Sequence, residues 1–207
     1  PKGVMLNQFG WVHAIERVLD RIQFTHNDRA VSLLPPWHAF ERAVEYGIVM
    51  RGMDFLVSDI QNLRNDLFEF KPTVFPSVPR IWETVYNGII TKVKKESPAS
   101  QAIFNFFLSV GSFWARWKAI AFGYDPAVKR PFILWSAVRR ITALLVLLAT
   151  SPLKLIAMRV FHGIHAALGG QLRMSVSGGS ALPAVVDQFL TAIGITVLEG
   201  YGMTETS

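Results

Sequence analysis

The last ten residues, LEGYGMTETS, combine residue types that together suit nucleotide chemistry. Gly200 and Gly202 let a ligand approach the backbone closely, because glycine has no side chain to exclude it. Tyr201 offers a flat ring to a base, and Thr204 offers a hydroxyl to a phosphate. Glu205 offers a hard oxygen ligand for Mg²⁺, which is commonly held by one or two carboxylates plus substrate phosphates. A glycine turn with exposed polar residues would also give this string, so the string alone does not establish a site.

Three further motifs add flexible or polar groups. The motif VSGGSALP carries Gly178, Gly179 and Ser180 directly after an apolar run. The motif PKG places Lys2 beside a glycine, and a lysine in a flexible loop suits a phosphate contact. The motif LLPPWHAFER sets His38 just past an apolar run, where an isolated histidine is more often a packing or surface residue than a catalytic one.

Apolar periodicity predicts the elements that would position these motifs. Apolar residues at helical spacing predict helices at 8–23, 38–50, 60–70, 81–95 and 184–194. Short apolar runs bounded by proline or glycine predict strands within 30–36, 53–59, 72–79, 172–183 and 195–205. This alternation predicts an α/β fold with a largely parallel sheet flanked by helices. Ligands of such sheets bind beyond the carboxyl ends of the strands, where we expect both glycine turns to lie.

Composition excludes several classes of protein. Hydrophobic residues make up 51% of the 207 residues and charged residues 17%, which excludes intrinsic disorder. The sequence has no cysteine and therefore no disulfide framework, thiolate metal site or cysteine nucleophile. His162 and His165 have no carboxylate nearby, which favours a surface or packing role over a metal pair.

The net charge of +6 is distributed unevenly. Residues 92–173 hold 12 lysines and arginines against two acids, a balance of +10, so the other residues hold nine against 13, a balance of −4. A basic block of this kind suits nucleic acid, an anionic membrane surface or an acidic protein. Nucleic acid is the least favoured of these partners, because the basic residues alternate with long apolar runs instead of clustering on a polar face.

The basic block is predicted to be helical and rich in apolar residues. One predicted helical stripe consists of Ile103, Phe106, Phe107, Val110, Trp114 and Trp117. Residues 141–153 carry no charge, but Pro152 is expected to interrupt them, and 13 residues are too few for a membrane span of about 20. Two interpretations stay open: a helix lying in a membrane interface, or a helical pair packed on its own domain.

The ordered set PKGVML, LLPPWHAFER, FPSVPRIWE, SVSGGSALP and EGYGMTETS resembles the adenylate-forming superfamily. Within it, the chain is most similar to the long-chain fatty acyl-CoA synthetases and the acyl-acyl-carrier-protein synthetases. The resemblance implies that residues 1–207 are a central fragment of the large N-terminal domain, with 92–173 as a mostly helical insertion.

This resemblance implies a ligase that uses ATP and Mg²⁺. A long-chain fatty acid attacks the α-phosphate to give an acyl-adenylate, and a thiol of CoA or acyl carrier protein then displaces AMP. The implied location is the cytoplasm or plastid stroma, with peripheral membrane association. The alternative is a membrane-surface binding module that acts through the basic block.

The resemblance also assigns roles to residues after the two glycine-bearing strands. Tyr201 would stack on adenine, and Thr204 would contact the α-phosphate. Glu205 would hold Mg²⁺, and Thr204 and Glu205 with His38 would form the catalytic set. Backbone contacts to the adenylate are implied for Gly178, Gly179, Ser180 and Gly202.

The remaining implied roles lie in the first third of the chain. Lys2 would be the end of a Ser/Thr/Gly-rich phosphate loop. His38 would lie beside the acyl channel with Trp37 as a neighbour, whereas Glu41 and Arg42 would form a structural ion pair. The rest of the phosphate loop, the ribose-binding aspartate and the adenylation lysine are not among the 207 residues, so the fragment alone is expected to be inactive.

Overall fold

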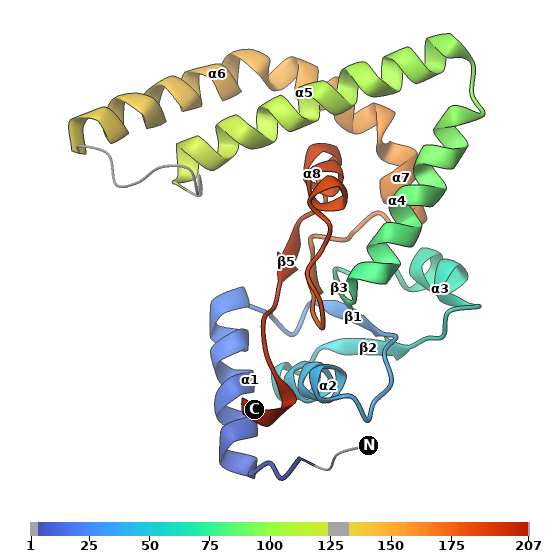
Figure 1. Cartoon of the computed structure of the whole chain (residues 1–207), viewed down its shortest axis with the longest axis vertical. Helices are drawn as coiled ribbons and strands as arrows, with labels where there is room; N and C mark the ends of the chain where they lie inside the picture. Colours follow the sequence, from blue (N-terminus) through green and yellow to red (C-terminus); the bar gives the residue numbers. More distant parts are fainter. Residues whose placement is uncertain (1–3, 124–132, 207) are drawn as a thin grey trace. The chain divides into compact units, whose positions relative to one another are not determined.

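The fold contains a parallel five-stranded sheet (Figure 1). The computed structural model describes residues 4–123 and 133–206 of the chain. The order of the sheet is β2-β1-β3-β4-β5, and all the paired strands run in parallel. The strands are β1 (Arg29–Ser32), β2 (Asp54–Val57), β3 (Val74–Ser77), β4 (Met174–Ser177) and β5 (Val197–Glu199). The predicted α/β class and parallel sheet are therefore confirmed.

The chain divides into two units, and the sheet belongs to the first. This unit comprises Pro1–Thr84, Ile164–Pro183 and Thr196–Ser207. Its helices are α1 (Gln8–Ile22), α2 (Ala39–Arg51) and α3 (Leu63–Phe70), and the unit ends with the 3₁₀ turn η1 (Thr204–Thr206). Helices α1 and α3 fall within the ranges predicted from periodicity, and α2 ends one residue beyond the predicted range 38–50.

The helices and the sheet of the first unit share an apolar core. Ala30 and Val74 from neighbouring strands pack with Ile48 of α2 and with Met53, which lies just after the end of α2. Helix α1 approaches α2 closely at Gly47, where an added Cβ would lie 3.3 Å from Leu19. Burial of this apolar surface supplies the main driving force for the unit to fold.

A buried carboxylate fixes the amino ends of three strands. Asp28, just before β1, accepts two hydrogen bonds from the guanidinium of Arg173, at 2.8 and 2.7 Å, just before β4. Asp28 also accepts hydrogen bonds from the Thr73 hydroxyl (2.7 Å), before β3, and from the Thr25 backbone amide (2.9 Å). Although burial opposes ionisation, these donors hold the pKa of Asp28 well below its usual range. We call this group the Asp28 clamp.

A second polar network lies at the carboxyl end of the sheet. The fully buried Trp82 of α4 (Pro79–Lys94) donates its indole N–H to the Ser77 hydroxyl at 2.7 Å. The Ser77 oxygen lies 3.1 Å from that of Ser175, on the neighbouring strand β4. The motif FPSVPRIWE thus supplies three of the four residues of β3 and the tryptophan that anchors the start of α4.

The second unit is helical and comprises Val85–Gly163 and Ala184–Ile195. Besides most of α4, its main helices are α5 (Pro98–Phe122), α6 (Ile133–Val160) and α8 (Ala184–Ile193), and α7 (His162–Ala167) crosses the boundary between the units. The backbones of α5 and α8 meet at Gly111, where an added Cβ would lie 2.0 Å from the Ala192 carbonyl oxygen. The first segment of this unit, Val85–Gly163, thus begins and ends before the predicted insertion 92–173 does, and a second segment adds α8.

The aromatic stripe predicted for α5 is only partly buried. Trp114 and Trp117 pack against a cluster formed by α5 and α6, but Ile103 and Phe106 are exposed. Phe104, which is not part of the predicted stripe, is buried against Phe161 with 5.7 Å between ring centroids. The residues of the predicted helical stripe are therefore divided between packed and exposed positions.

Pro152 lies inside α6 and does not end it, contrary to expectation. The uncharged run is thus part of a 28-residue helix. Within the described part of the chain, Trp135–Val160 is the one helical segment long and apolar enough to cross a membrane. A single such helix is weak evidence for a span, because core helices of soluble proteins meet the same criterion.

Candidate functional site

The two predicted glycine turns leave adjacent strands at the same edge of the sheet. Strands β4 and β5 pair in parallel, with Ser177 opposite Glu199. The backbone amide of Gly200 donates to the Ser177 carbonyl at 2.8 Å, and that of Gly178 donates to the Ser77 carbonyl at 3.1 Å. The expectation that both turns lie beyond the carboxyl ends of neighbouring strands is confirmed.

The turn after β4 is specified by its glycines and by one carboxylate. Gly179 has a φ of +86°, in the left-handed region that favours glycine. Gly178 is buried, and an added Cβ there would lie 3.0 Å from the Phe40 ring. The Leu182 backbone amide donates to Glu199 Oε2 at 3.0 Å, which ties the turn to the end of β5. The motifs LLPPWHAFER and VSGGSALP are thus in contact through Phe40 and Gly178.

We predict that Gly178→Val destabilises the protein by about 1–3 kcal/mol, because the added methyl groups overlap the Phe40 ring and force it to move. Thermal unfolding measures the change. The matched control is Gly88→Val on an exposed face of α4, where an added Cβ meets no atom within 4 Å. Equal melting temperatures for the two variants would contradict the contact.

The residues after β5 form an exposed segment. Tyr201 is 95% exposed, and Thr204 and Glu205 are exposed at the start of η1. Among the described residues, no hydrogen bond or ion pair joins these three side chains to one another or to the turn after β4. A Cβ added at Gly202 would meet nothing within 4 Å, so packing within the described chain does not require this glycine. The structure thus brings together the strand ends but not the side chains beyond them.

The histidine of LLPPWHAFER caps a helix. His38 is the N-cap of α2, and its Nδ1 accepts a hydrogen bond from the Phe40 backbone amide at 3.3 Å. His38 and Trp37 are both exposed, in the loop that leaves the carboxyl end of β1. The acyl-channel role of His38 remains a prediction, and Lys2 lies outside the described residues.

The predicted ion pair between Glu41 and Arg42 is wrong. Glu41 is fully buried and accepts a hydrogen bond from the Ser32 hydroxyl at 2.5 Å, whereas Arg42 lies 3.9 Å from Glu45. Adjacent positions on a helix face different directions, so one side chain points into the protein and the other outward. Glu41 instead joins the start of α2 to the end of β1, on either side of the loop that carries His38.

Burial raises the pKa of Glu41, and the nearby charge of Glu45 adds to the rise, while the Ser32 hydroxyl opposes it. The folded state therefore binds the proton more tightly than the unfolded state does. The contribution of Glu41 to stability is largest below its ordinary pKa and is lost as pH rises through the folded pKa.

We therefore expect Glu41→Gln to be as stable as the unaltered protein, or more stable, at neutral pH. The variant should also lack the decline in stability that Glu41 causes as pH rises. Chemical denaturation at a series of pH values between 4 and 8 measures it. The matched control Glu69→Gln, at an exposed position of α3, should leave the pH profile unchanged. A large loss of stability in Glu41→Gln at neutral pH would contradict the interpretation.

Among residues 4–123 and 133–206, no group of three or more His, Cys, Asp or Glu side chains could hold a metal ion alone. Glu205 is an exposed carboxylate in η1, six residues beyond the end of β5. Because Mg²⁺ is commonly held by one or two carboxylates together with substrate phosphates, one such residue fits a metal that arrives with a nucleotide.

Phe40 and Glu199 are part of this region but were not predicted from the sequence. Phe40 packs on Gly178, and Glu199 accepts the hydrogen bond that holds the turn after β4. Glu199 is exposed at the end of the largely exposed strand β5, so nothing in the sequence pointed to this hydrogen bond.

Comparison with known families gives a match over the whole chain. Residues 1–207 match the family described as AMP-binding enzyme.

Curated relatives also align over the whole chain. The chain is 35% identical to probable acyl-activating enzyme 16, chloroplastic, from Arabidopsis thaliana. It is 34% identical to the long-chain-fatty-acid--[acyl-carrier-protein] ligase AEE15, chloroplastic, also from Arabidopsis. It is 32% identical to the long-chain-fatty-acid--CoA ligase FadD15 of Mycobacterium tuberculosis. All three alignments cover 100% of this chain, but only 29% of each Arabidopsis relative and 31% of the mycobacterial one.

One solved structure also aligns with the chain. It is described as a malonyl-CoA ligase ternary product complex with methylmalonyl-CoA and AMP bound. The sequence identity is 19% and the TM-score 0.49, and the alignment covers 99% of this chain and 30% of that chain.

Proposed function

The chain belongs to the AMP-binding enzyme family, and we propose that it is the central part of an ATP-dependent fatty acid ligase. The observation that carries the proposal is the pairing of β4 and β5, which places both glycine turns at one edge of the sheet within the residues that match the family. Its relatives are named as fatty acid ligases, which supports a fatty acid as the substrate.

The proposed reaction has two steps. The carboxylate oxygen of a long-chain fatty acid attacks the α-phosphorus of ATP, the bond to the β-phosphate oxygen breaks, and acyl-adenylate and pyrophosphate result. The thiol of CoA or acyl carrier protein then attacks the acyl carbon, AMP leaves, and the thiol proton passes to solvent. Attack by an anion on a polyanion requires that the charges be neutralised and the reacting atoms aligned.

The residues that follow β4 and β5 suit these demands. The exposed ring of Tyr201 would stack on the adenine, and the Thr204 hydroxyl would donate to the α-phosphate. The backbone of the turn at Gly178, Gly179 and Ser180, with that of Gly202, would line the adenylate pocket. Gly202 supports this proposal, because an added Cβ there meets no described atom and the backbone is open to a ligand.

Glu205 would hold Mg²⁺, which when bound supplies positive charge next to the phosphate oxygens. Lys2 would add a second positive charge near the phosphates. His38 would lie beside the acyl chain, near Trp37, at the carboxyl end of β1.

The proposed substrate is a long-chain acid, and the proposed acceptor is CoA or acyl carrier protein, because the relatives are named for both thiols. The proposed location is the cytoplasm or plastid stroma, since two relatives are named as chloroplastic. Because the chain spans less than a third of these relatives, we propose that its 207 residues alone do not turn over substrate.

The test uses the complete protein that contains this chain, with ATP, Mg²⁺, palmitate and hydroxylamine. Acyl-hydroxamate should form only when all components are present, and thioester should form when CoA or acyl carrier protein replaces hydroxylamine. If no fatty acid releases pyrophosphate from ATP, the ligase proposal fails. Hydroxamate formation by the isolated 207 residues would contradict only the proposed inactivity of the fragment.

A further inference from the structure

Helix α6 exposes a wide apolar face. Its opposite face packs on the rest of the second unit through Ala143, Leu147 and Ala157, which are all buried. Large apolar side chains on α6 remain exposed at Trp135, Val138, Ile141, Leu144, Leu145, Leu148, Leu153, Leu155, Ile156 and Val160. An exposed apolar surface of this extent usually marks a site of interaction.

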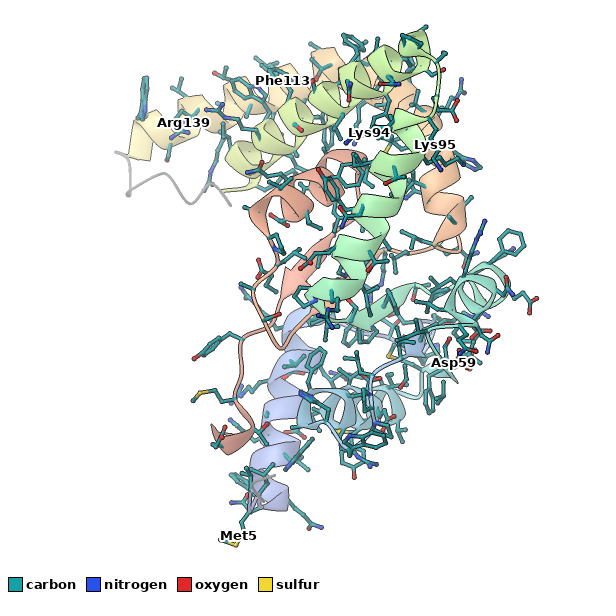
Figure 2. The ribbon with its side chains drawn as sticks, turned by 45° about the vertical axis from the view of Figure 1, so that its right-hand side comes forward. Met5, Asp59, Lys94, Lys95, Phe113 and Arg139 are labelled. Atoms are coloured by element: carbon teal, nitrogen blue, oxygen red, sulfur yellow. The ribbon has the colours of Figure 1, made fainter. Side chains whose placement is uncertain are left out.

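The spacing of these residues makes the face continuous. Val138, Ile141, Leu145 and Leu148 follow the 3.6-residue period, and Leu155 extends the same stripe. The neighbouring helix α5 adds Phe113, which is exposed and lies 6.0 Å from Trp117 between ring centroids. Figure 2 shows Phe113 on α5 and Arg139 on α6, the two long helices of this unit.

Positive charge surrounds the face but does not interrupt it. The described residues of the second unit hold nine lysines and arginines and two acids, Glu96 and Asp187, a balance of +7. Arg139 and Arg140 lie at one end of the apolar face and Arg159 lies at the other. Lys154 points inward, with its Nζ 3.5 Å from the Ala192 carbonyl oxygen.

This pattern fits a lipid bilayer better than it fits other partners. An acidic protein or a nucleic acid would require the cations at the centre of the surface, which is uncharged from residue 141 to 153. A second copy of the chain would bring two surfaces of the same charge together, which is unfavourable. Anionic headgroups around an apolar interior match both the cationic ends and the apolar centre.

We propose that the exposed face of α6, with Phe113 of α5, docks on an anionic membrane surface with α6 lying in the plane of the interface. A crossing of the bilayer does not fit as well. Trp135–Val160 is long and apolar enough to span a bilayer, but it contains Arg139, Arg140, Lys154 and Arg159, and charged side chains inside a membrane are costly. The packed face of α6 also cannot face lipid while it contacts the rest of its unit.

The first experiment measures binding of the complete protein to sedimented vesicles of phosphatidylcholine with or without phosphatidylglycerol, in the absence of ATP. Strong binding is expected only to vesicles with phosphatidylglycerol. The double variant Leu145→Gln/Leu148→Gln should weaken it on the order of 10-fold or more, because two apolar side chains no longer enter the lipid. The variant Arg139→Gln/Arg140→Gln should weaken it by about 10-fold and reduce its sensitivity to salt.

The matched control is Val49→Gln/Phe68→Gln, which replaces two exposed apolar residues of the first unit and should leave binding unchanged. Absence of binding to phosphatidylglycerol vesicles would overturn the proposal. So would equal binding by the control and by Leu145→Gln/Leu148→Gln. Because ATP is absent, failure of this experiment is independent of failure of the ligase proposal.

The second experiment asks what covers the face in solution. A polarity-sensitive fluorophore is attached to Leu148→Cys in the complete protein, with any other reactive cysteines replaced. Its emission should report water without vesicles and an apolar environment with them. An apolar environment without vesicles would mean that another segment or a second copy covers the face, and would overturn the proposal. Resistance of the membrane-bound protein to carbonate extraction would indicate a span and would also overturn it.

Discussion

Glu205→Ala in the complete protein is expected to lower the rate of acyl-hydroxamate formation by about 100-fold or more, the range seen when one stabiliser of transition-state charge is removed. In the proposed function, the Glu205 carboxylate is the ligand that this chain supplies to Mg²⁺. Its side chain is exposed and has no hydrogen bond or ion pair with another described residue, so the loss of activity should occur without a loss of stability.

The measurement compares rates over a series of Mg²⁺ concentrations, together with a thermal unfolding curve. Raised Mg²⁺ should restore part of the activity of Glu205→Ala, because a weakened metal site is filled at higher concentration. Glu69→Gln, an exposed carboxylate on α3, is the control and should keep its activity at every concentration. Unchanged activity and unchanged Mg²⁺ dependence in Glu205→Ala would remove Glu205 from the site.

The order of strands and helices could be predicted because periodicity is a local property. All five strands were predicted from apolar runs bounded by proline or glycine. The strands in the structure are shorter than the predicted ranges, because they end where the hydrogen-bond ladder between strands cannot continue. The predicted strand 30–36 ends as β1 at Ser32, shortly before Pro35 and Pro36, which have no amide hydrogen to donate. Parallel pairing followed from the alternation of strands with helices.

Contacts between elements could not be predicted in the same way. Helix α8 packs on α5 because Gly111 lets the two backbones meet, and a glycine within a helical pattern was the only sign of it. The pairing of Glu41 with Ser32 depends on which side of α2 faces the sheet. The spacing rule for helices was enough to exclude an ion pair between Glu41 and Arg42, since neighbouring positions diverge.

In the candidate site, too, the strand ends could be predicted from the sequence, whereas the positions of the side chains could not. The two glycine turns were placed at one edge because they follow strands, and strand order determines that edge. The positions of Tyr201 and Thr204 could not be derived, because their side chains are exposed and packing within the described chain does not constrain them. The roles of these residues were predicted from motif order, whereas the geometry supports only the strand ends from which they extend.

Asp28→Asn is expected to destabilise the protein by about 2–4 kcal/mol. This is the cost of removing the negative charge from a largely buried ion pair whose carboxylate also accepts hydrogen bonds from uncharged donors. The substitution leaves Arg173 without its counter-ion and weakens the contacts to Thr73 and Thr25. The expected cost is less than for a fully buried pair, because the Arg173 side chain is 39% exposed and can be partly hydrated. Since the Asp28 clamp joins the starts of β1, β3 and β4, its loss should loosen the sheet that positions both glycine turns.

The pH dependence distinguishes loss of the charge from a general loss of packing. The pKa of Asp28 is depressed in the folded state, so the unfolded state binds the proton more readily. The stabilisation is present above the ordinary pKa of aspartate, about 3.9, and is lost as pH falls from there through the folded pKa. Chemical denaturation should therefore show a smaller acid-induced decline in Asp28→Asn than in the unaltered protein, and the control Asp54→Asn, at an exposed position of β2, should behave like the unaltered protein. A decline of equal slope in Asp28→Asn would mean that other carboxylates cause the acid sensitivity and that the clamp does not act through its charge.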